Sequence, residues 1–239
     1  MVDIAVVDYG MGNLRSVQQA VRKVAPGADI AVTGEADVIA SAGRVIFPGQ
    51  GAAPDCMREI HTRGLDSVIA GVIREGKPFL GICMGLQVLF EHSEEGDTPC
   101  LGLFSGQVRR FASGQQDVQG SKLKVPHMGW NQVRRVNTLA SPRGEATVAP
   151  SPPGGGLGWG NTPEHPLWSG IEQDARFYFV HSYYVEPRDS SLVQATSDYP
   201  QPFVCAVAKE NLFAVQFHPE KSAAAGLKLL QNFINWNPA

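Results

Sequence analysis

The amino-acid sequence predicts an α/β fold: a doubly wound, mostly parallel central sheet with flanking helices, and an added antiparallel strand-rich region in the second half. Short apolar runs alternate with amphipathic helical patterns as far as Phe90, which is typical of a parallel sheet covered by helices. After Gly96 the pattern changes to a series of short extended runs. The chain then closes with one more apolar strand and an amphipathic helix.

In the first half, the strand Ile4 to Val7 leads through the loop Asp8 to Asn13 into a helix from Leu14 to Val24, whose apolar residues recur at helical spacing. The same alternation predicts the next elements, which are a strand at Asp29 to Thr33, a helix at Ala36 to Ala40, a strand at Val45 to Phe47 and a helical region from Asp55 to Arg74 interrupted at Gly64.

Extended runs in the second half predict strands at Leu103 to Phe111, Val125 to Val136, Phe177 to Val185, Leu192 to Thr196, Val204 to Ala208 and Phe213 to Phe217. A final helix is expected from Ala223 to Asn235. The stretch from about 138 to 162 is too rich in proline and glycine for regular structure, and we interpret it as a surface insertion in a single domain spanning residues 1–239.

Composition narrows the class of protein. The content of 43% apolar and 18% charged residues is ordinary for a soluble globular chain, and the N-terminus carries no basic leader, so we expect a cytoplasmic protein. A formal net charge of −3 without a long lysine or arginine cluster argues against nucleic acid or membrane partners. The four cysteines lack the spacing of zinc or redox sites, so no metal and no disulfide is expected.

One short stretch carries the strongest chemical signal, Gly81-Ile82-Cys83-Met84-Gly85 between two apolar runs. We interpret it as a strand, a sharp turn and a helix that continues towards Phe90, with the glycines leaving room for close approach of strand and helix. Cys83 would then be presented at a helix N-terminus, which favours the thiolate, and the Met84 amide could stabilise an oxyanion. A buried structural cysteine is an equally good interpretation of this stretch alone.

A base for Cys83 is found among the six histidines. His218 follows an apolar strand and precedes Pro219 and Glu220, and in an extended segment residues two apart point to the same side. Glu220 can therefore orient the imidazole, which predicts the triad Cys83, His218 and Glu220. The turn Gly49-Gln50-Gly51 offers unobstructed backbone amides for an oxyanion, although proline-glycine turns after strands are also common without function.

These motifs together resemble the triad-type, class-I glutamine amidotransferases, and they cover nearly the whole chain in the expected order. Three further segments resemble one branch of that family, the glutaminase subunits of imidazole glycerol phosphate synthases of histidine biosynthesis. They are Asp8 to Asn13, Pro126 to Asn131 and Phe179 to Tyr184.

The resemblance implies that glutamine is hydrolysed through a glutamyl thioester on Cys83, without a cofactor, and that ammonia passes to a separate (β/α)₈ cyclase subunit in a heterodimer. It implies an oxyanion hole from Gly51 and Met84, and glutamine contacts from Gln87, Glu95, Ser182 and Tyr183. It also implies a partner interface that includes Asn13, Pro126, Met128 and Trp130. From composition alone, Trp130 and Tyr183 are more often core aromatics.

Two features depart from the family pattern: Gln50 stands where a small apolar residue is usual, and the insertion is longer than the family needs. Two rival functions remain open. The first is a stand-alone cysteine hydrolase or peptidase with the same triad, which would need no partner. The second is a catalytically silent subunit that docks a partner through Pro126 to Asn131, although all three triad positions are present in the sequence.

Overall fold

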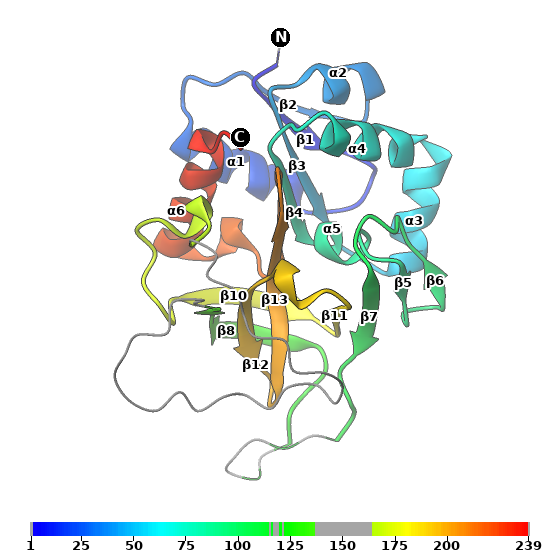
Figure 1. The fold of residues 1–239 in the computed structure, drawn as a ribbon, viewed down its shortest axis with the longest axis vertical. Coiled ribbons are helices and arrows are strands. Elements are labelled where there is room, and N and C mark those ends of the chain that lie inside the picture. Colours follow the sequence, from blue (N-terminus) through cyan, green and yellow to red (C-terminus); the bar gives the residue numbers. More distant parts are fainter. Residues whose placement is uncertain (1, 115, 117–119, 121, 137–163, 239) are drawn as a thin grey trace.

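The structure, a computed structural model, describes residues 2–114, 116, 120, 122–136 and 164–238 (Figure 1). The predicted surface insertion near 138–162 lies outside the described residues. No helix in the described part of the chain is both long and apolar enough to cross a membrane.

The centre of the molecule is a sheet whose strands run in the order β2-β1-β3-β4-β14-β13-β11-β7-β5-β6. The pairs from β2 to β14 are parallel, and those of β14 with β13, β13 with β11 and β11 with β7 are antiparallel. The parallel strands are β1 (Ile4–Val7), β2 (Ile30–Thr33), β3 (Arg44–Gly49), β4 (Phe79–Cys83) and β14 (Leu212–Val215). The predicted fold class is thus confirmed.

Helices cover both faces of the parallel half (Figure 1). They are α1 (Leu14–Val24), α2 (Ala36–Ser41), α3 (Ala53–Thr62), α4 (Leu65–Arg74), α5 (Met84–Gln87) and α6 (Ala223–Asn235). Along β1, Ile4 and Val6 pack in the cluster with α1 and α6, whereas Ala5 and Val7 pack in the cluster with α2, α3 and α4. Successive strand residues point to opposite faces, so one short apolar strand serves two cores.

The second half of the chain extends the sheet with strands that pair antiparallel, except for the parallel pair of β5 with β7. They are β5 (His92–Ser93), β6 (Thr98–Pro99), β7 (Gly106–Arg110), β9 (Arg134–Arg135), β11 (Tyr183–Pro187), β12 (Val193–Asp198) and β13 (Pro202–Lys209). A separate two-stranded sheet pairs β8 (His127–Gln132) with β10 (Arg176–His181). Three 3₁₀ turns complete the described elements: η1 (Pro166–Trp168), η2 (Ser190–Leu192) and η3 (Pro219–Lys221).

Three sequence-based boundaries were wrong in an instructive way. The predicted strand Val125 to Val136 is two strands, β8 in the small sheet and β9 in the central sheet. The predicted strand Phe177 to Val185 is two strands, because the chain leaves the small sheet after His181 and enters the central sheet at Tyr183. The helix expected to continue from Cys83 towards Phe90 is a single turn that ends at Gln87. Val88, Leu89 and Phe90 are fully buried, and a short continuous apolar run does not indicate which backbone conformation buries it.

Candidate active site

The sharp turn between β4 and α5, at Cys83, has the unusual backbone conformation that the flanking glycines predict. Cys83 adopts φ 56° and ψ −108°, a conformation that a side-chain-bearing residue rarely takes. A Cβ atom at Gly81 would lie 2.7 Å from the Gly85 carbonyl oxygen, and one at Gly85 would collide with the Phe47 carbonyl oxygen. The two glycines are therefore required for the turn, as the sequence predicted.

Cys83 itself is less accessible than expected. It lines a cavity of about 270 Å³, but only 5% of the residue is exposed, so the expectation of a presented rather than buried cysteine was wrong. Because α5 is one turn long, any helix-dipole effect on the thiol is confined to that turn.

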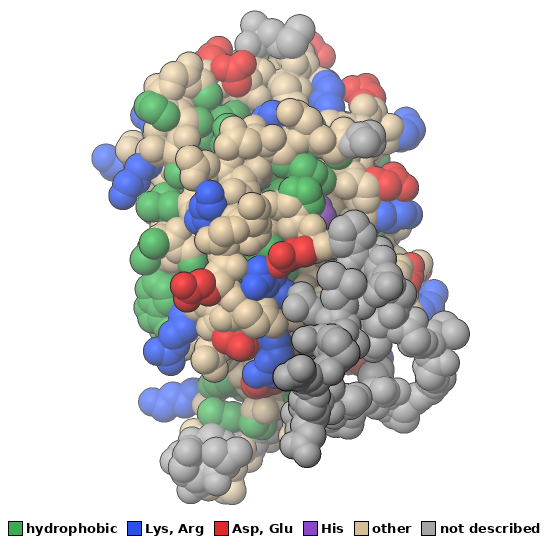
Figure 2. Space-filling view, turned by 60° about the vertical axis from the view of Figure 1, so that its left-hand side comes forward, with side chains coloured by type: hydrophobic (Ala, Val, Ile, Leu, Met, Phe, Trp, Pro, Cys, Tyr) green, Lys and Arg blue, Asp and Glu red, His purple; other side chains and the backbone are tan. Residues whose placement is uncertain are grey.

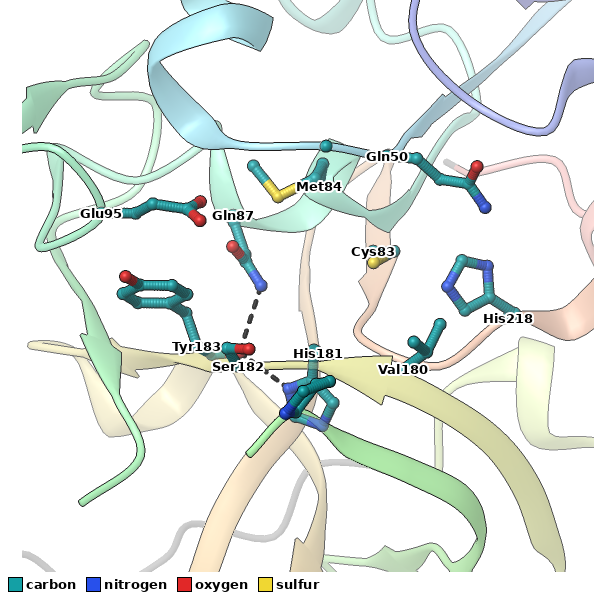
Figure 3. Close-up of a pocket in the computed structure, with 12 residues that line it drawn as sticks. Gln50, Cys83, Met84, Gln87, Glu95, Val180, His181, Ser182, Tyr183 and His218 are labelled. Atoms are coloured by element: carbon teal, nitrogen blue, oxygen red, sulfur yellow. Dashed lines mark hydrogen bonds between the residues drawn. The ribbon is translucent and has the colours of Figure 1, made fainter. Parts of the chain in front are cut away.

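The cavity brings together most of the predicted site residues (Figure 3). The predicted residues in its walls are Gly51, Cys83, Met84, Gln87, Glu95, Pro126, Ser182, Tyr183 and His218. Gln50, Val180 and His181 complete the lining. Glu220 lies behind His218, and Asn13, Met128 and Trp130 lie outside the cavity lining.

His218 is held rigidly beside the nucleophile. Its Nδ1 lies 2.9 Å from Glu220 Oε1, and both side chains are almost fully buried. The contact was predicted, but for the wrong reason, because Pro219 starts the 3₁₀ turn η3 rather than an extended segment. The Ser222 hydroxyl donates to the His218 carbonyl oxygen at 2.6 Å and accepts from the Tyr178 backbone N–H, which fixes the turn.

The other ring nitrogen of His218, Nε2, has no hydrogen-bond partner of good geometry within the described residues, and Figure 3 shows the ring turned towards Cys83. Burial lowers the pKa of His218, but the charge of Cys83 and hydrogen bonding to it, followed by Glu220, outweigh burial and raise the pKa to about 10. The pair is thus arranged for proton transfer between sulfur and imidazole.

On the other side of Cys83, two glutamine side chains form a buried chain of hydrogen bonds. Gln87 Nε2 donates to the Tyr183 carbonyl oxygen at 3.1 Å and to Gln216 Oε1 at 3.0 Å. Gln216 Nε2 donates to Cys83 Sγ at 3.7 Å. Gln87 Oε1 is buried without a partner in the described structure, and in Figure 3 it lies on the side of Glu95. It is therefore an unused acceptor in the cavity wall.

The Tyr183 carbonyl oxygen also anchors a histidine pair beneath the cavity. It lies 2.7 Å from His181 Nδ1, and His181 Nε2 lies 3.0 Å from His127 Nδ1. Because a carbonyl only accepts, His181 carries its proton on Nδ1, and His127 donates to its Nε2. Burial lowers the pKa of His127 to about 4 and that of His181 to about 3, so both rings are neutral near pH 7.

The turn after β3 is packed against the nucleophile. A Cβ atom at Gly49 would lie 2.7 Å from Met84 Cβ and collide with the Tyr9 hydroxyl, and Gly51 has φ 103°. The Gln50 carbonyl oxygen accepts from the Cys56 thiol at 3.5 Å. The turn therefore depends on glycine at both positions.

Glu95 reaches the cavity from the other side. Its Oε2 accepts a 2.8 Å hydrogen bond from the Ala53 backbone N–H, the first residue of α3. This bond leaves Oε1 free for a donor in the cavity.

The residues expected at a partner interface lie on or near the small sheet. Met128 is 63% exposed and Trp130 is 46% exposed, and they are the two large exposed hydrophobic side chains among the described residues. Trp130 packs edge-on against Tyr178 of the neighbouring strand, so it is not the core aromatic that composition favours. Asn13 is the N-cap residue of α1, and its side chain makes no capping hydrogen bond.

Sequence reasoning missed four residues of the site: Val180, His181, Gln216 and Gln50 as a wall residue. A signal existed for two of them, because Gln216 directly follows an apolar strand two residues before His218, and His181 directly precedes Ser182. Nothing in the sequence predicted that the side chains of Gln216 and Gln87 meet, since they are 129 positions apart.

The described residues offer neither a metal-binding cluster nor, on the face drawn in Figure 2, a surface of one charge sign. In the part of the chain that the structure describes, no group of three or more His, Cys, Asp or Glu could hold a metal ion. On the face drawn in Figure 2, basic and acidic side chains are interspersed rather than gathered by sign.

Comparisons with known proteins agree with this geometry. The model of the family "Glutamine amidotransferase class-I" matches residues 5–236. The chain is 60% identical, over 99% of its length and 92% of the relative, to a Thiobacillus denitrificans protein named imidazole glycerol phosphate synthase subunit HisH. It is 53% identical over the full length of both chains to the Aromatoleum aromaticum protein of that name. A solved glutamine amidotransferase shares the fold, with a TM-score of 0.64 at 15% identity and 97% coverage of each chain.

Proposed function

The chain belongs to the class-I glutamine amidotransferase family, and on that premise we propose that it is the glutaminase subunit of an imidazole glycerol phosphate synthase. In this proposal it hydrolyses glutamine to glutamate and ammonia and passes the ammonia to a (β/α)₈ cyclase subunit, which makes imidazole glycerol phosphate and aminoimidazole carboxamide ribotide. The relatives that carry this name match essentially the whole chain, which supports the assignment.

The observation that carries the proposal is the meeting of Cys83 and His218 in one cavity, with Glu220 bonded to the far side of the imidazole. His218 takes the thiol proton, and the sulfur attacks the carboxamide carbon of glutamine. His218 then returns the proton to the leaving ammonia. In the second half of the reaction it activates the water that hydrolyses the thioester.

We assign oxyanion stabilisation to the backbone N–H groups of Met84 and Gly51, because both residues belong to the lining of the cavity that holds Cys83. The unused Gln87 Oε1 and the free oxygen of Glu95 are suited to accept hydrogen bonds from the ammonium group of glutamine. The backbone at Ser182 and Tyr183, where the chain passes from one sheet to the other, would hold the α-carboxylate and amine.

For the partner interface we propose the exposed side chains Met128 and Trp130, together with Pro126 and Asn13. Pro126 lies in the cavity wall and Met128 follows two residues later, so a partner seated on β8 would be next to the glutamine site. In this proposal residues 1–239 form one glutamine amidotransferase domain that acts in the cytoplasm as half of a heterodimer.

The direct experiment is glutamate release from glutamine by the purified chain, alone and mixed with a cyclase subunit and its ribotide ligand. We expect strong stimulation in the mixture and none with Cys83→Ala. Activity on peptides without any partner would favour the stand-alone hydrolase. A complex that forms but releases no glutamate would favour the silent subunit.

A further inference from the structure

We propose that Gln216 is a positioning residue for the nucleophile: its amide donates a hydrogen bond to Cys83 Sγ and ties the sulfur to Gln87 in the glutamine-binding wall. This inference rests on the proposed function, because it assigns a role within the same site. Gln216 is not part of the cavity lining, so we assign it no direct contact with the substrate.

The orientation of both amides follows from a single backbone atom. The Tyr183 carbonyl oxygen can only accept, so the Gln87 atom beside it must be Nε2. That same Nε2 lies 3.0 Å from Gln216, which must therefore present Oε1 to it. The remaining polar atom of Gln216 is Nε2, and it faces Cys83 Sγ at 3.7 Å. Gln216 thus donates to the sulfur and cannot accept from it.

The strand register places Gln216 where this contact is made. β14 runs parallel to β4 with Val215, its last residue, opposite Ile82. Gln216, the residue after β14, therefore lies beside Cys83, the last residue of β4. Gln216 is 0% exposed, and its backbone N–H donates to the Cys205 carbonyl oxygen at 2.9 Å. Gln216 is therefore fixed by hydrogen bonds of both its backbone and its side chain.

The hydrogen bond from Gln216 affects both the position and the charge state of the Cys83 sulfur. A donor is strengthened when its acceptor becomes charged, so the Gln216 amide favours the thiolate over the thiol. His218 approaches the sulfur from the cavity, as Figure 3 shows, and the two groups hold the nucleophile between them. Because Gln87 bonds to Gln216, the group proposed to bind glutamine and the group that holds the sulfur form one rigid unit.

A purely structural role for Gln216 predicts a different behaviour. If the amide only filled a buried site, its loss would lower the stability of the fold and leave the reactivity of Cys83 unchanged. Asn211 is a matched control for that effect. It precedes β14 as Gln216 follows it, it is buried, and its side-chain amide donates to the carbonyl oxygens of Ile73 and Lys77.

The test compares Gln216→Met, Gln216→Glu and Asn211→Met with the wild-type chain. The readout is the rate of Cys83 alkylation by iodoacetamide between pH 5 and 10, followed by peptide mass spectrometry, with thermal unfolding measured in parallel. Gln216→Met should slow alkylation at pH 7 by about tenfold and move the pH midpoint of the reaction up by about one unit. Gln216→Glu keeps the acceptor for Gln87 but loses the amide donor, and it should slow alkylation at least as much.

In Asn211→Met, Cys83 should be alkylated at a rate within about twofold of the wild-type rate, even if the unfolding temperature of this variant falls as far as that of Gln216→Met. Wild-type alkylation kinetics in both Gln216 variants would overturn the inference. Alkylation needs no glutamine and no partner, so the two proposals fail separately. Slowed alkylation in a chain whose wild-type complex releases no glutamate would support the positioning role while contradicting the proposed function.

Discussion

The nucleophile region and the small sheet β8–β10 are built on opposite principles. Around Cys83, the side chains of Gln216, His218 and Glu220 are buried. His218 is hydrogen-bonded to Glu220, and Gln216 is hydrogen-bonded to Gln87 and to Cys83 itself. The small sheet instead exposes Met128 and Trp130 to solvent. The proposed catalytic groups are thus held in place by contacts within this chain, whereas the small sheet leaves two large apolar side chains without cover, as the proposed partner interface requires.

The two regions are joined through one carbonyl oxygen. Tyr183 O is bonded to Gln87 on the cavity side and to His181 beneath it, and His181 is bonded to His127 at the start of β8. A displacement of β8 would reach Gln87 through three hydrogen bonds.

Replacing the nucleophile should abolish activity without affecting the small sheet. We expect Cys83→Ala to lower glutamate release by at least about a thousandfold, because no other group in the site can form the thioester. Binding to the cyclase subunit, measured by titration calorimetry, should be unchanged. Cys100→Ala, a partly buried cysteine outside the cavity, is the control. Residual activity above that level would mean that Cys83 is not the nucleophile.

Removing the orienting charge should affect both rate and pH dependence. We expect Glu220→Gln to lower kcat by about a hundredfold or more. The raised pKa of His218 contributes stability that is complete below pH 6.5 and is lost as the pH rises to about 10. The variant loses part of that contribution, so its urea midpoint should fall less than the wild-type midpoint between pH 6.5 and 10. Parallel curves would contradict the coupling between Glu220 and His218.

The histidine pair should make the fold sensitive to acid. The lowered pKa of His127 means that its contribution to stability is complete above pH 6.5 and is lost as the pH falls to about 4, by on the order of 3 kcal/mol. His127→Phe should flatten the fall in urea midpoint over that range, because the buried ring that takes up the proton is removed. An unchanged slope for His127→Phe would show that its protonation is not linked to folding.

Truncating Trp130 in the proposed partner interface should weaken association with the cyclase subunit and leave the reactivity of Cys83 unchanged. We expect Trp130→Ala to raise the Kd for the cyclase subunit by about thirtyfold, since exposed tryptophans are frequent anchors of interfaces. Cys83 alkylation in the chain alone should stay at the wild-type rate. Lys209→Ala, at the exposed end of β13, serves as the control. Unchanged affinity in Trp130→Ala would place the interface elsewhere.

Gln50 should have the smallest effect. Its side chain lies in the cavity wall near His218 (Figure 3). The glutamine amidotransferases that the sequence resembles usually have a small apolar residue at this position. We expect Gln50→Val to raise glutamate release by the chain alone a few-fold, about threefold, because a shorter side chain leaves room for the tetrahedral intermediate. An identical rate would show that this position does not limit activation.

The nucleophile region was the easier one to predict. The glycines around Cys83 form a local pattern that sterics enforce whatever surrounds them. His218 and Glu220 are only two residues apart, so their contact is local as well, although a 3₁₀ turn makes it rather than the extended segment expected. The sequence alone also predicted the alternation of strands and helices, because each element has its own periodicity. The helix Ala223–Asn235 has the predicted bounds for this reason.

What the tertiary structure decided is which distant residues meet. Gln216 reaches Cys83 only through the register of β14 on β4, and His127 reaches His181 only because β8 pairs with β10. The break at Ser182 depends on which of two sheets each half of the segment joins. Hydrogen bonds between residues far apart in the chain carry no local signature, because the same polar side chain is equally compatible with solvent until the packing of the strands encloses it.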